Sequence, residues 1–308
     1  MEKPTLTIFI ATYNREAYLP ISINSVLNQT YQDFSLVILD NASQDRTGEV
    51  VAPFLKDQRV SYIRHEQNLG SCGNVNYAVT HCETDYFMIF HDDDIMLPHL
   101  VETQMKEMQS HSEYAIISAN AFMIDDQGIC KNQAIFDLGT ERRLFSGSEY
   151  LQHFLRYGSC VVCPMVLYRT AFMKEHALTF SLDAGPAGDQ YMWFEIERCG
   201  GTVCVLNEVL LHYRKYQKQE STMFRLPMEY QLLNHLLKGE HYRSVIQRSL
   251  KTQFLLFYKL YILDFNEADK NLPAMCRQFR LSAFLQLCAK ALSKIRVIVK
   301  SFLKGIRS

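Results

Sequence analysis

Three adjacent aspartates, Asp92, Asp93 and Asp94, are the residues of this sequence best suited to chemistry. They lie between two apolar stretches, 86–90 and 95–98. Two unit charges about 5 Å apart repel by roughly 3 kcal/mol at an effective dielectric near 20, so we expect a partner that offsets the repulsion. A carboxylate cluster favours a hard cation such as Mg²⁺ or Mn²⁺, which is often shared with substrate phosphates. The alternative is a solvated acidic turn, or a helix N-cap in the case of Asp94.

The elements expected to position these aspartates alternate between buried strands and helices, the pattern of a βαβ sheet. Ligands of open α/β sheets bind outside the carboxyl ends of the strands. Asp40 ends the second predicted strand and the three aspartates end the fourth, so we expect them to face one cleft. The apolar runs predict strands over residues 6–11, 35–40, 59–65, 85–94 and 114–120.

The chain after residue 120 is less regular. A helix over 192–201 is followed by an apolar strand over 202–214, and the sequence is helical from about 225 onward. Cys160 and Cys163 form a CxxC pair, but they lie in an apolar run without a second pair. We therefore interpret this segment as a buried strand rather than as a zinc or redox site.

The composition bounds the class of protein. A chain of 308 residues with 48% hydrophobic and 21% charged residues is typical of one large globular domain, or of one domain plus an appendage. Its net charge of −1 excludes a globally basic nucleic-acid binder. The nine cysteines lack framework spacing, and the amino-terminal apolar stretch is too short for a signal peptide. We expect a cytoplasmic protein with no nucleic-acid partner.

Several short motifs follow one another in a fixed order between residues 5 and 220: "ATYN", "SVLNQTY", "DNASQDRT", "NLGSCGN", "FHDDDIMLP" and "GDQYMWFEI". Together they resemble glycosyltransferase family 2, whose members are inverting, nucleotide-sugar-dependent enzymes. The resemblance implies an α/β GT-A fold, a Rossmann-like nucleotide-binding mixed sheet flanked by helices. It implies a catalytic domain over residues 1–220, with a helical C-terminal extension over 221–308. Dinucleotide, P-loop, zincin and esterase motifs are absent from the sequence.

The resemblance also implies roles for residues around the nucleotide and the metal. Asp40 would accept a hydrogen bond from the base, and Thr12 and Asn14 would line the same base and ribose pocket. Asp93 would be the principal ligand of Mn²⁺ or Mg²⁺. Asp92 would contact the ribose or assist the metal.

Two histidines bear on the same metal site. His91 stands where many family members have the first aspartate of the motif, which leaves open whether one or two carboxylates reach the ion. His212 is a further candidate for the diphosphate or metal site.

Asp189 matches the family's catalytic base, which would deprotonate the acceptor hydroxyl. Members usually have Glu-Asp at this place, whereas this chain has Gly188 and Asp189. Without the resemblance, Asp189 would be interpreted as a helix N-cap. Arg214 and Lys218 follow in a segment that resembles the family's mobile lid, where a phosphate contact and a solvated basic loop are both open. Trp193 is expected in the core.

The chain ends in a strongly basic segment, with nine Lys and Arg and no acid between residues 270 and 308. If residues 282–308 form a helix, basic and apolar side chains fall on opposite faces, which is typical of a helix lying on an anionic membrane surface. The alternative is that the apolar face docks on the catalytic domain or on a second subunit of a homo-oligomer. The basic face comprises Lys290, Lys294, Arg296, Lys300, Lys304 and Arg307.

The donor implied by the resemblance is a UDP-sugar, and the acceptor is a glycan or a lipid-linked saccharide. The setting is assembly of a bacterial surface polysaccharide or glycolipid, with the protein peripheral on the inner face of the cell membrane. One alternative is a sugar-phosphate nucleotidyltransferase, although such an enzyme usually has a Gly-rich basic loop where this chain has "TYNREAYL". The other is a non-catalytic scaffold that binds a nucleotide sugar.

Overall fold

The structure is a computed structural model that describes residues 4–184, 187–215, 232, 235–236 and 238–247. The chain divides into two compact units. The first comprises Met1–Phe154 and Gly158–Arg225, and the second comprises Leu155–Tyr157 and Leu226–Ser308. The second unit contains the described helix α10 (Glu240–Gln247). Lys218 and the basic segment 282–308 lie outside the described residues. Within the described part of the chain, the helices are too short or too polar to cross a membrane.

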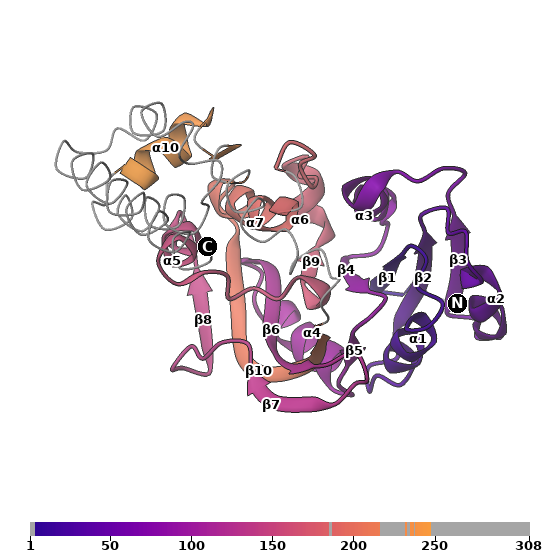
Figure 1. Cartoon of the computed structure of the whole chain (residues 1–308). Helices are drawn as coiled ribbons and strands as arrows, with labels where there is room; N and C mark the ends of the chain where they lie inside the picture. The colour runs from indigo at the N-terminus through magenta and orange to yellow at the C-terminus, as the bar shows by residue number, and fades with distance from the viewer. Residues whose placement is uncertain (1–3, 185–186, 216–231, 233–234, 237, 248–308) are drawn as a thin grey trace, which may run out of the picture. The chain divides into compact units, whose positions relative to one another are not determined.

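The first unit is built on one mixed sheet with the strand order β3-β2-β1-β4-β9-β6-β10-β5 (Figure 1). Strands β3, β2, β1 and β4 run parallel, as the βαβ pattern predicts. Beyond them β9 is antiparallel to both β4 and β6, while β10 is parallel to β6. The strands are β1 (Leu6–Thr12), β2 (Phe34–Asp40), β3 (Val60–Arg64), β4 (Tyr86–His91), β5 (Ile95–Met96), β6 (Tyr114–Ile124), β7 (Cys130–Ala134), β8 (Arg142–Phe145), β9 (Leu167–Arg169) and β10 (Thr202–Arg214).

Helices flank this sheet, and α1 (Leu19–Leu27) illustrates how the sequence forms them. In α1, Pro20 occupies the first turn, where its missing N–H costs nothing, and Leu19, Ile23 and Val26 are buried at helical spacing. The helices are α1 (Leu19–Leu27), α2 (Thr47–Val51), α3 (Gly70–His81), α4 (Leu100–Ser110), α5 (Glu149–Tyr157), α6 (Thr170–Glu175) and α7 (Gly188–Arg198), with 3₁₀ turns η1 (Ala52–Lys56) and η2 (Cys163–Met165).

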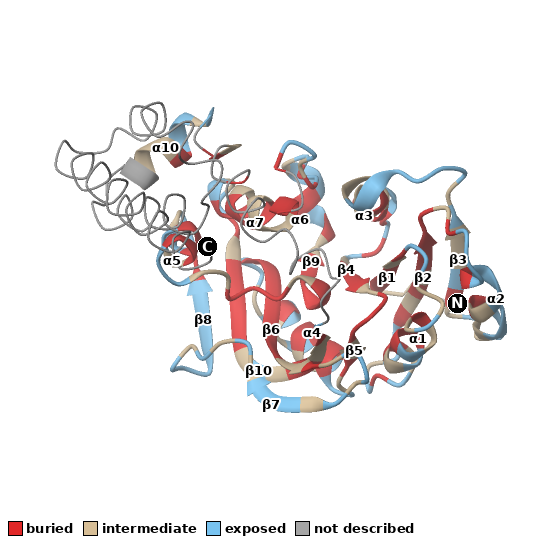
Figure 2. Cartoon of the chain, in the orientation of Figure 1, coloured by how far each residue is buried: buried red, intermediate tan, exposed pale blue. Residues whose placement is uncertain are grey.

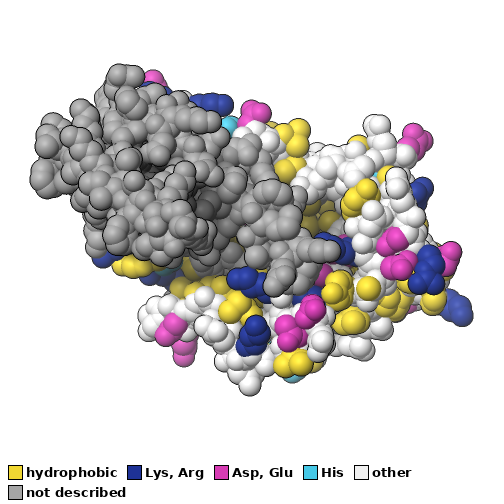
Figure 3. Space-filling model, in the orientation of Figure 1, with side chains coloured by type: hydrophobic (Ala, Val, Ile, Leu, Met, Phe, Trp, Pro, Cys, Tyr) yellow, Lys and Arg dark blue, Asp and Glu magenta, His cyan; other side chains and the backbone are white. Residues whose placement is uncertain are grey.

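The core lies along the central strands. Six of the seven residues of β1 are buried, as expected for a parallel strand covered on both faces. Figure 2 shows β1, β4, β6 and β10 largely buried, whereas β8 is exposed at its first three residues. Trp193 is fully buried, which confirms its predicted place in the core. On the face drawn in Figure 3, basic and acidic side chains of the described residues are intermingled.

Three segments differ from the sequence-based prediction. The fourth strand ends at His91, so the three aspartates form the turn between β4 and β5 rather than the end of the strand. The CxxC segment is not a strand: Cys163 begins η2, because Pro164 offers no N–H to a sheet ladder. The helix predicted over 192–201 begins earlier, at Gly188, and this places Asp189 in its first turn.

Candidate functional site

The carboxyl ends of three neighbouring strands meet at one edge of the sheet. The register pairs Thr12 of β1 with Asp40 of β2, and Ala11 of β1 with His91 of β4. The turn that carries Asp92, Asp93 and Asp94 follows His91 directly. Asp40 and the three aspartates therefore lie along the same edge, which is the arrangement expected from the sequence.

Asp40 is fully buried at the end of β2. Its Oδ1 accepts the N–H of Ser43 at 2.8 Å, and its Oδ2 accepts the hydroxyl of Tyr62. The guanidinium of Arg64 lies 3.5 Å from the same Oδ2. This carboxylate is held rigidly, and Tyr62 and Arg64 are neighbours that the sequence pattern did not single out.

Asn14 ties the loop after β1 to the loop after β2. Its φ of 54° lies in the left-handed region, which asparagine tolerates better than most residues. The Asn14 N–H donates to the Ser43 hydroxyl at 2.9 Å, and its side-chain oxygen accepts the N–H of Gln44 at 2.7 Å. Asn14 is exposed, and its two bonds hold it against the loop that follows Asp40.

Asp92 faces the loop that follows β1. Its Oδ1 lies 3.7 Å from Nε of Arg15, and the residue is only 8% exposed. Burial raises the pKa of Asp92 to about 7, and the charge of Asp93 adds to the shift while Thr12 and Arg15 oppose it. Thr12 Oγ1 is buried without a hydrogen bond of normal geometry among the described residues, although the hydroxyl is near enough to favour the charged form of Asp92.

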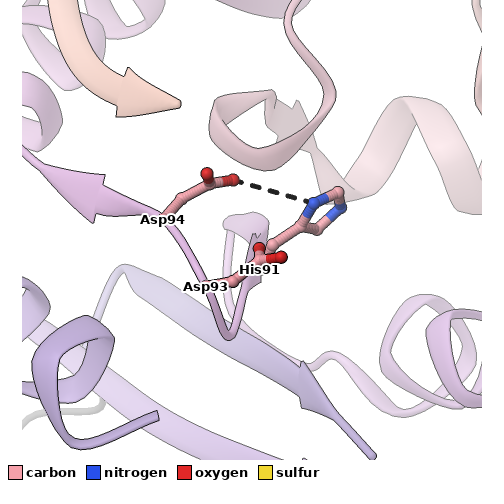
Figure 4. Close-up of side chains that lie close together, drawn as sticks. All are labelled: His91, Asp93 and Asp94. Carbon is pink, nitrogen blue, oxygen red and sulfur yellow. Dashed lines mark ion pairs between the residues drawn. The ribbon is translucent and has the colours of Figure 1, made fainter. Parts of the chain in front are cut away.

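Asp93 lies with His91 and Asp94 in a compact cluster (Figure 4). One potential ligand atom from each residue lies within 4.8 Å of the other two. The Nδ1 atom of His91 is 3.8 Å from Oδ2 of Asp94, an ion pair when the imidazole is protonated. Burial raises the pKa of Asp94 well above its usual value, and the charge of Asp93 raises it further. Burial lowers the pKa of His91.

This cluster differs from the set expected from the sequence, which was Asp93, Asp92 and His212, and a metal role for Asp92 or His212 stays a prediction. Asp92 and His212 are not members of it, since Asp92 faces Arg15 and His212 pairs in register with Ile95 between β10 and β5. Asp94 is not a helix N-cap, because α4 begins after His99. The turn after His91 directs Asp94 toward the imidazole instead.

Arg214 lies at the buried end of a strand, whereas the sequence suggested a loop. It is the last residue of β10 and only 2% exposed, so it is not part of a loop. Its guanidinium donates to the carbonyl oxygens of Asp93 at 2.7 Å, Asp125 at 2.9 Å and Asp126 at 3.0 Å. Its backbone N–H donates to Oδ1 of Asp94 at 2.7 Å. Through these bonds Arg214 holds the aspartate turn in place, and its contact with a phosphate stays a prediction.

Asp189 lies in the first turn of α7, where its charge interacts favourably with the helix dipole. It is not the N-cap, which is Ala187. Burial raises the pKa of Asp189 to about 6, while hydrogen bonds from the Gln190 N–H and the Cys163 thiol oppose the shift. A carboxylate with this pKa is ionised at neutral pH and is still basic enough to accept a proton.

Cys163 interacts with Asp189 and is influenced by the charge of Asp94. Burial raises the pKa of the Cys163 thiol well above its usual value, and the charges of Asp189 and Asp94 raise it further. One side chain thus lies within electrostatic reach of both carboxylates. The sequence pattern marked Cys163 only as half of a CxxC pair, and its partner Cys160 is buried.

A sequence model of a protein family matches the part of the chain that carries most of this site. The model described as glycosyl transferase family 2 matches residues 7–176, which is more than half of the chain. The chain belongs to glycosyl transferase family 2. The matched range includes Asp40 and the aspartate turn, and it ends before Asp189 and Arg214.

Curated relatives match mainly through part of their length. An uncharacterized glycosyltransferase of Methanocaldococcus jannaschii is 36% identical over 42% of this chain and 45% of its own length. Another from Haemophilus influenzae is 26% identical over 72% of this chain and 68% of its own. A teichoic acid poly(glycerol phosphate) polymerase of Staphylococcus epidermidis is 24% identical over 86% of this chain but only 33% of the polymerase.

Solved structures share the fold. S. aureus TarS 1-349 in complex with UDP-GlcNAc aligns with a TM-score of 0.66 and 17% identity, over 89% of this chain and 78% of that one. The mannosyltransferase PcManGT from Pyrobaculum calidifontis, in complex with GDP-Man and Mn²⁺, aligns with a TM-score of 0.58 and 13% identity, over 99% and 84%. The predicted GT-A fold, a mixed sheet flanked by helices, is confirmed for this chain.

Proposed function

We propose that this chain transfers a sugar from a nucleotide-sugar donor, a UDP-sugar, to an acceptor hydroxyl with inversion at the anomeric carbon. One observation carries the proposal: Asp40, the aspartate turn and Thr12 share the carboxyl edge of the parallel strands, in a chain of glycosyl transferase family 2. The UDP-GlcNAc complex of TarS and the GDP-Man complex of PcManGT support a nucleotide-sugar donor of this class.

The base of the nucleotide would lie against Asp40 and the loop of Asn14. Asp40 Oδ2 accepts the Tyr62 hydroxyl in this structure, and a carboxylate oxygen has a second lone pair for a base N–H. Thr12 ends β1, which lies between β2 with Asp40 and β4, whose following turn begins with Asp92, and the ribose would lie against Thr12 and Asp92. Exposed Tyr13 borders the same loop.

The donor atoms of the aspartate turn fit a divalent cation. Two buried carboxylates and one imidazole converge, and Oδ2 of Asp94 is buried without a hydrogen-bond partner among the described residues. His91, Asp93 and Asp94 would hold the ion. When bound, a divalent ion neutralises the charge that develops on a departing diphosphate.

Asp189 would accept the proton of the acceptor hydroxyl. The hydroxyl oxygen forms the new bond to the anomeric carbon as the bond to the nucleoside diphosphate breaks, and the configuration inverts because attack is from the opposite side. General-base catalysis of this kind contributes roughly 10²–10⁴ in rate. The pKa of Asp189, about 6, suits that role at neutral pH.

Titration with UDP, with and without Mn²⁺, tests the donor site. We expect wild-type protein to bind UDP more tightly with Mn²⁺, and Asp93→Asn to lose most of that gain. The exposed substitution Asp137→Asn serves as a matched control. UDP binding that is independent of the ion, and unchanged in Asp93→Asn, would reject a metal-assisted donor site.

The wider setting is also part of the proposal. The similarity to a teichoic acid polymerase supports a role in the synthesis of a bacterial surface glycan, with a glycan or lipid-linked acceptor. We assign catalysis to residues 1–220, and contact with an anionic membrane surface to residues 282–308. This would place the protein peripherally on the inner face of the membrane.

A further inference from the structure

His91 is the member of the cluster that the sequence left without a role. It ends β4, and its imidazole lies beside the carboxylates of Asp93 and Asp94 (Figure 4). The ligand atoms of the three residues converge within 4.8 Å of one another. Imidazole nitrogen is a good ligand for transition-metal ions and a poor one for Mg²⁺ and Ca²⁺, which prefer oxygen.

A second observation points to a ligand at this place. Oδ2 of Asp94 is fully buried and accepts no hydrogen bond within the described part of the chain. The His91 nitrogen is 3.8 Å away from it, beyond hydrogen-bond distance. A buried carboxylate oxygen left unpaired is costly, and a cation between the imidazole and the carboxylates would offset that cost.

The turn is held firmly enough to keep this arrangement. The backbone carbonyl of Asp94 accepts the hydroxyl of Ser22 at 2.7 Å, and Oδ1 of Asp94 accepts the backbone N–H of Arg214 at 2.7 Å. The Arg214 guanidinium holds the Asp93 carbonyl at 2.7 Å. With Oδ1 already bonded, Oδ2 is the Asp94 oxygen left to face the imidazole.

We propose that His91 is a metal ligand, and that it makes this site select Mn²⁺ over Mg²⁺. The inference deepens the proposed function, since it names which cation would accompany the nucleotide sugar. Two carboxylates keep the site suitable for Mn²⁺, which prefers oxygen ligands as Mg²⁺ does. Mn²⁺ is also a transition-metal ion, so it accepts an imidazole nitrogen more readily than Mg²⁺ does. Mg²⁺ would have to exchange a preferred oxygen or water ligand for nitrogen in near-ideal octahedral geometry.

Direct metal binding tests the selectivity without an activity assay. Free Mn²⁺ is counted by electron paramagnetic resonance during titration of the full chain, and Mg²⁺ affinity is obtained by competition. We expect Mn²⁺ to bind wild-type protein at least about tenfold more tightly than Mg²⁺, a factor of the size usual for changes around a metal site. A preference below about threefold in the wild-type protein would overturn the proposal, whatever the variants do.

Substitutions then locate the source of the preference. His91→Asp supplies an all-oxygen set, so the ratio of Mn²⁺ to Mg²⁺ affinity should fall by about tenfold. His91→Asn should weaken Mn²⁺ binding and leave Mg²⁺ binding nearly unchanged. His99→Asn makes the same change at an exposed histidine outside the cluster and serves as the control. An unchanged ratio in both His91 variants would remove His91 as a ligand.

Different results would overturn the metal role of His91 and the proposed nucleotide-sugar function. If Mn²⁺ selectivity is present but UDP binding is absent with every ion, the metal site stands and the nucleotide-sugar function fails. If UDP binding depends equally on Mn²⁺ and Mg²⁺, the function stands and the role of His91 fails.

Discussion

Replacing Arg214 with lysine should destabilise the protein strongly, although the charge is kept. The guanidinium is 2% exposed and donates to the carbonyls of Asp93, Asp125 and Asp126, whereas one ammonium group has no planar fork that spans three acceptors. Each buried acceptor left unpaired costs about 1–3 kcal/mol. With two acceptors lost, we expect the free energy of unfolding to fall by about 2–6 kcal/mol.

Urea unfolding at pH 7 with linear extrapolation measures this loss. Arg46→Lys is the matched control, because Arg46 forms an exposed ion pair with Glu16 and its substitution should leave the unfolding midpoint nearly unchanged. The Asp93 carbonyl also loses its donor, so Mn²⁺ and UDP binding should weaken in folded Arg214→Lys protein. A loss below about 1 kcal/mol, with ligand binding unaffected, would refute the claim that Arg214 holds the aspartate turn.

Four further outcomes are expected. The rate of sugar transfer should rise about tenfold per pH unit up to about pH 6 and level off above it, because the base must be ionised and burial raises the pKa of Asp189 to about 6. Initial rates between pH 4.5 and 8 measure this dependence. A flat profile would count against Asp189 as the base. Glu197 accepts the N–H groups of Tyr150 at 2.8 Å and Leu151 at 3.2 Å at the start of α5, so Glu197→Ala should lower the free energy of unfolding by about 2–3 kcal/mol. Because burial raises the pKa of Glu197 from 4.5 to about 7, its contribution to stability is full below about 4.5 and is lost as the pH rises through 7; Glu197→Gln should remove that part of the pH dependence, and an identical pH profile would argue against it. Deleting residues 282–308 should release the protein from phosphatidylglycerol vesicles in co-sedimentation, whereas retained binding would reject a membrane role for this segment.

The parts of the site carried by the parallel strands could be predicted from sequence. Strands β1 and β2 are buried on both faces, so they appear as uninterrupted apolar runs, and their ends mark the ligand-binding edge. Asp40 and the aspartate turn were placed at that edge on these grounds. Asp189 was singled out only through the family motif, because an aspartate near a helix start is common in any protein.

The contacts that organise the turn could not be predicted in this way. Arg214 bonds to backbone carbonyls 121 and 89 residues away in the sequence, and backbone acceptors leave no mark in side-chain identity. An arginine that ends a strand therefore suggests a solvated loop until the fold is known. Asp94 is similar, since its partner Arg214 is 120 residues distant in the sequence. Its other carboxylate oxygen accepts no hydrogen bond from the residues that the structure describes, which no sequence pattern indicates.

The central claim is that the chain moves a sugar from a nucleotide donor with Asp189 as the base. Release of nucleoside diphosphate from a panel of nucleotide sugars, in the presence of Mn²⁺, tests it most directly in wild-type protein and Asp189→Asn. We predict release from a UDP-sugar by the wild type, and a loss of about 10²-fold or more in the variant with donor binding retained. No release from any donor, or equal release by Asp189→Asn, would contradict the account.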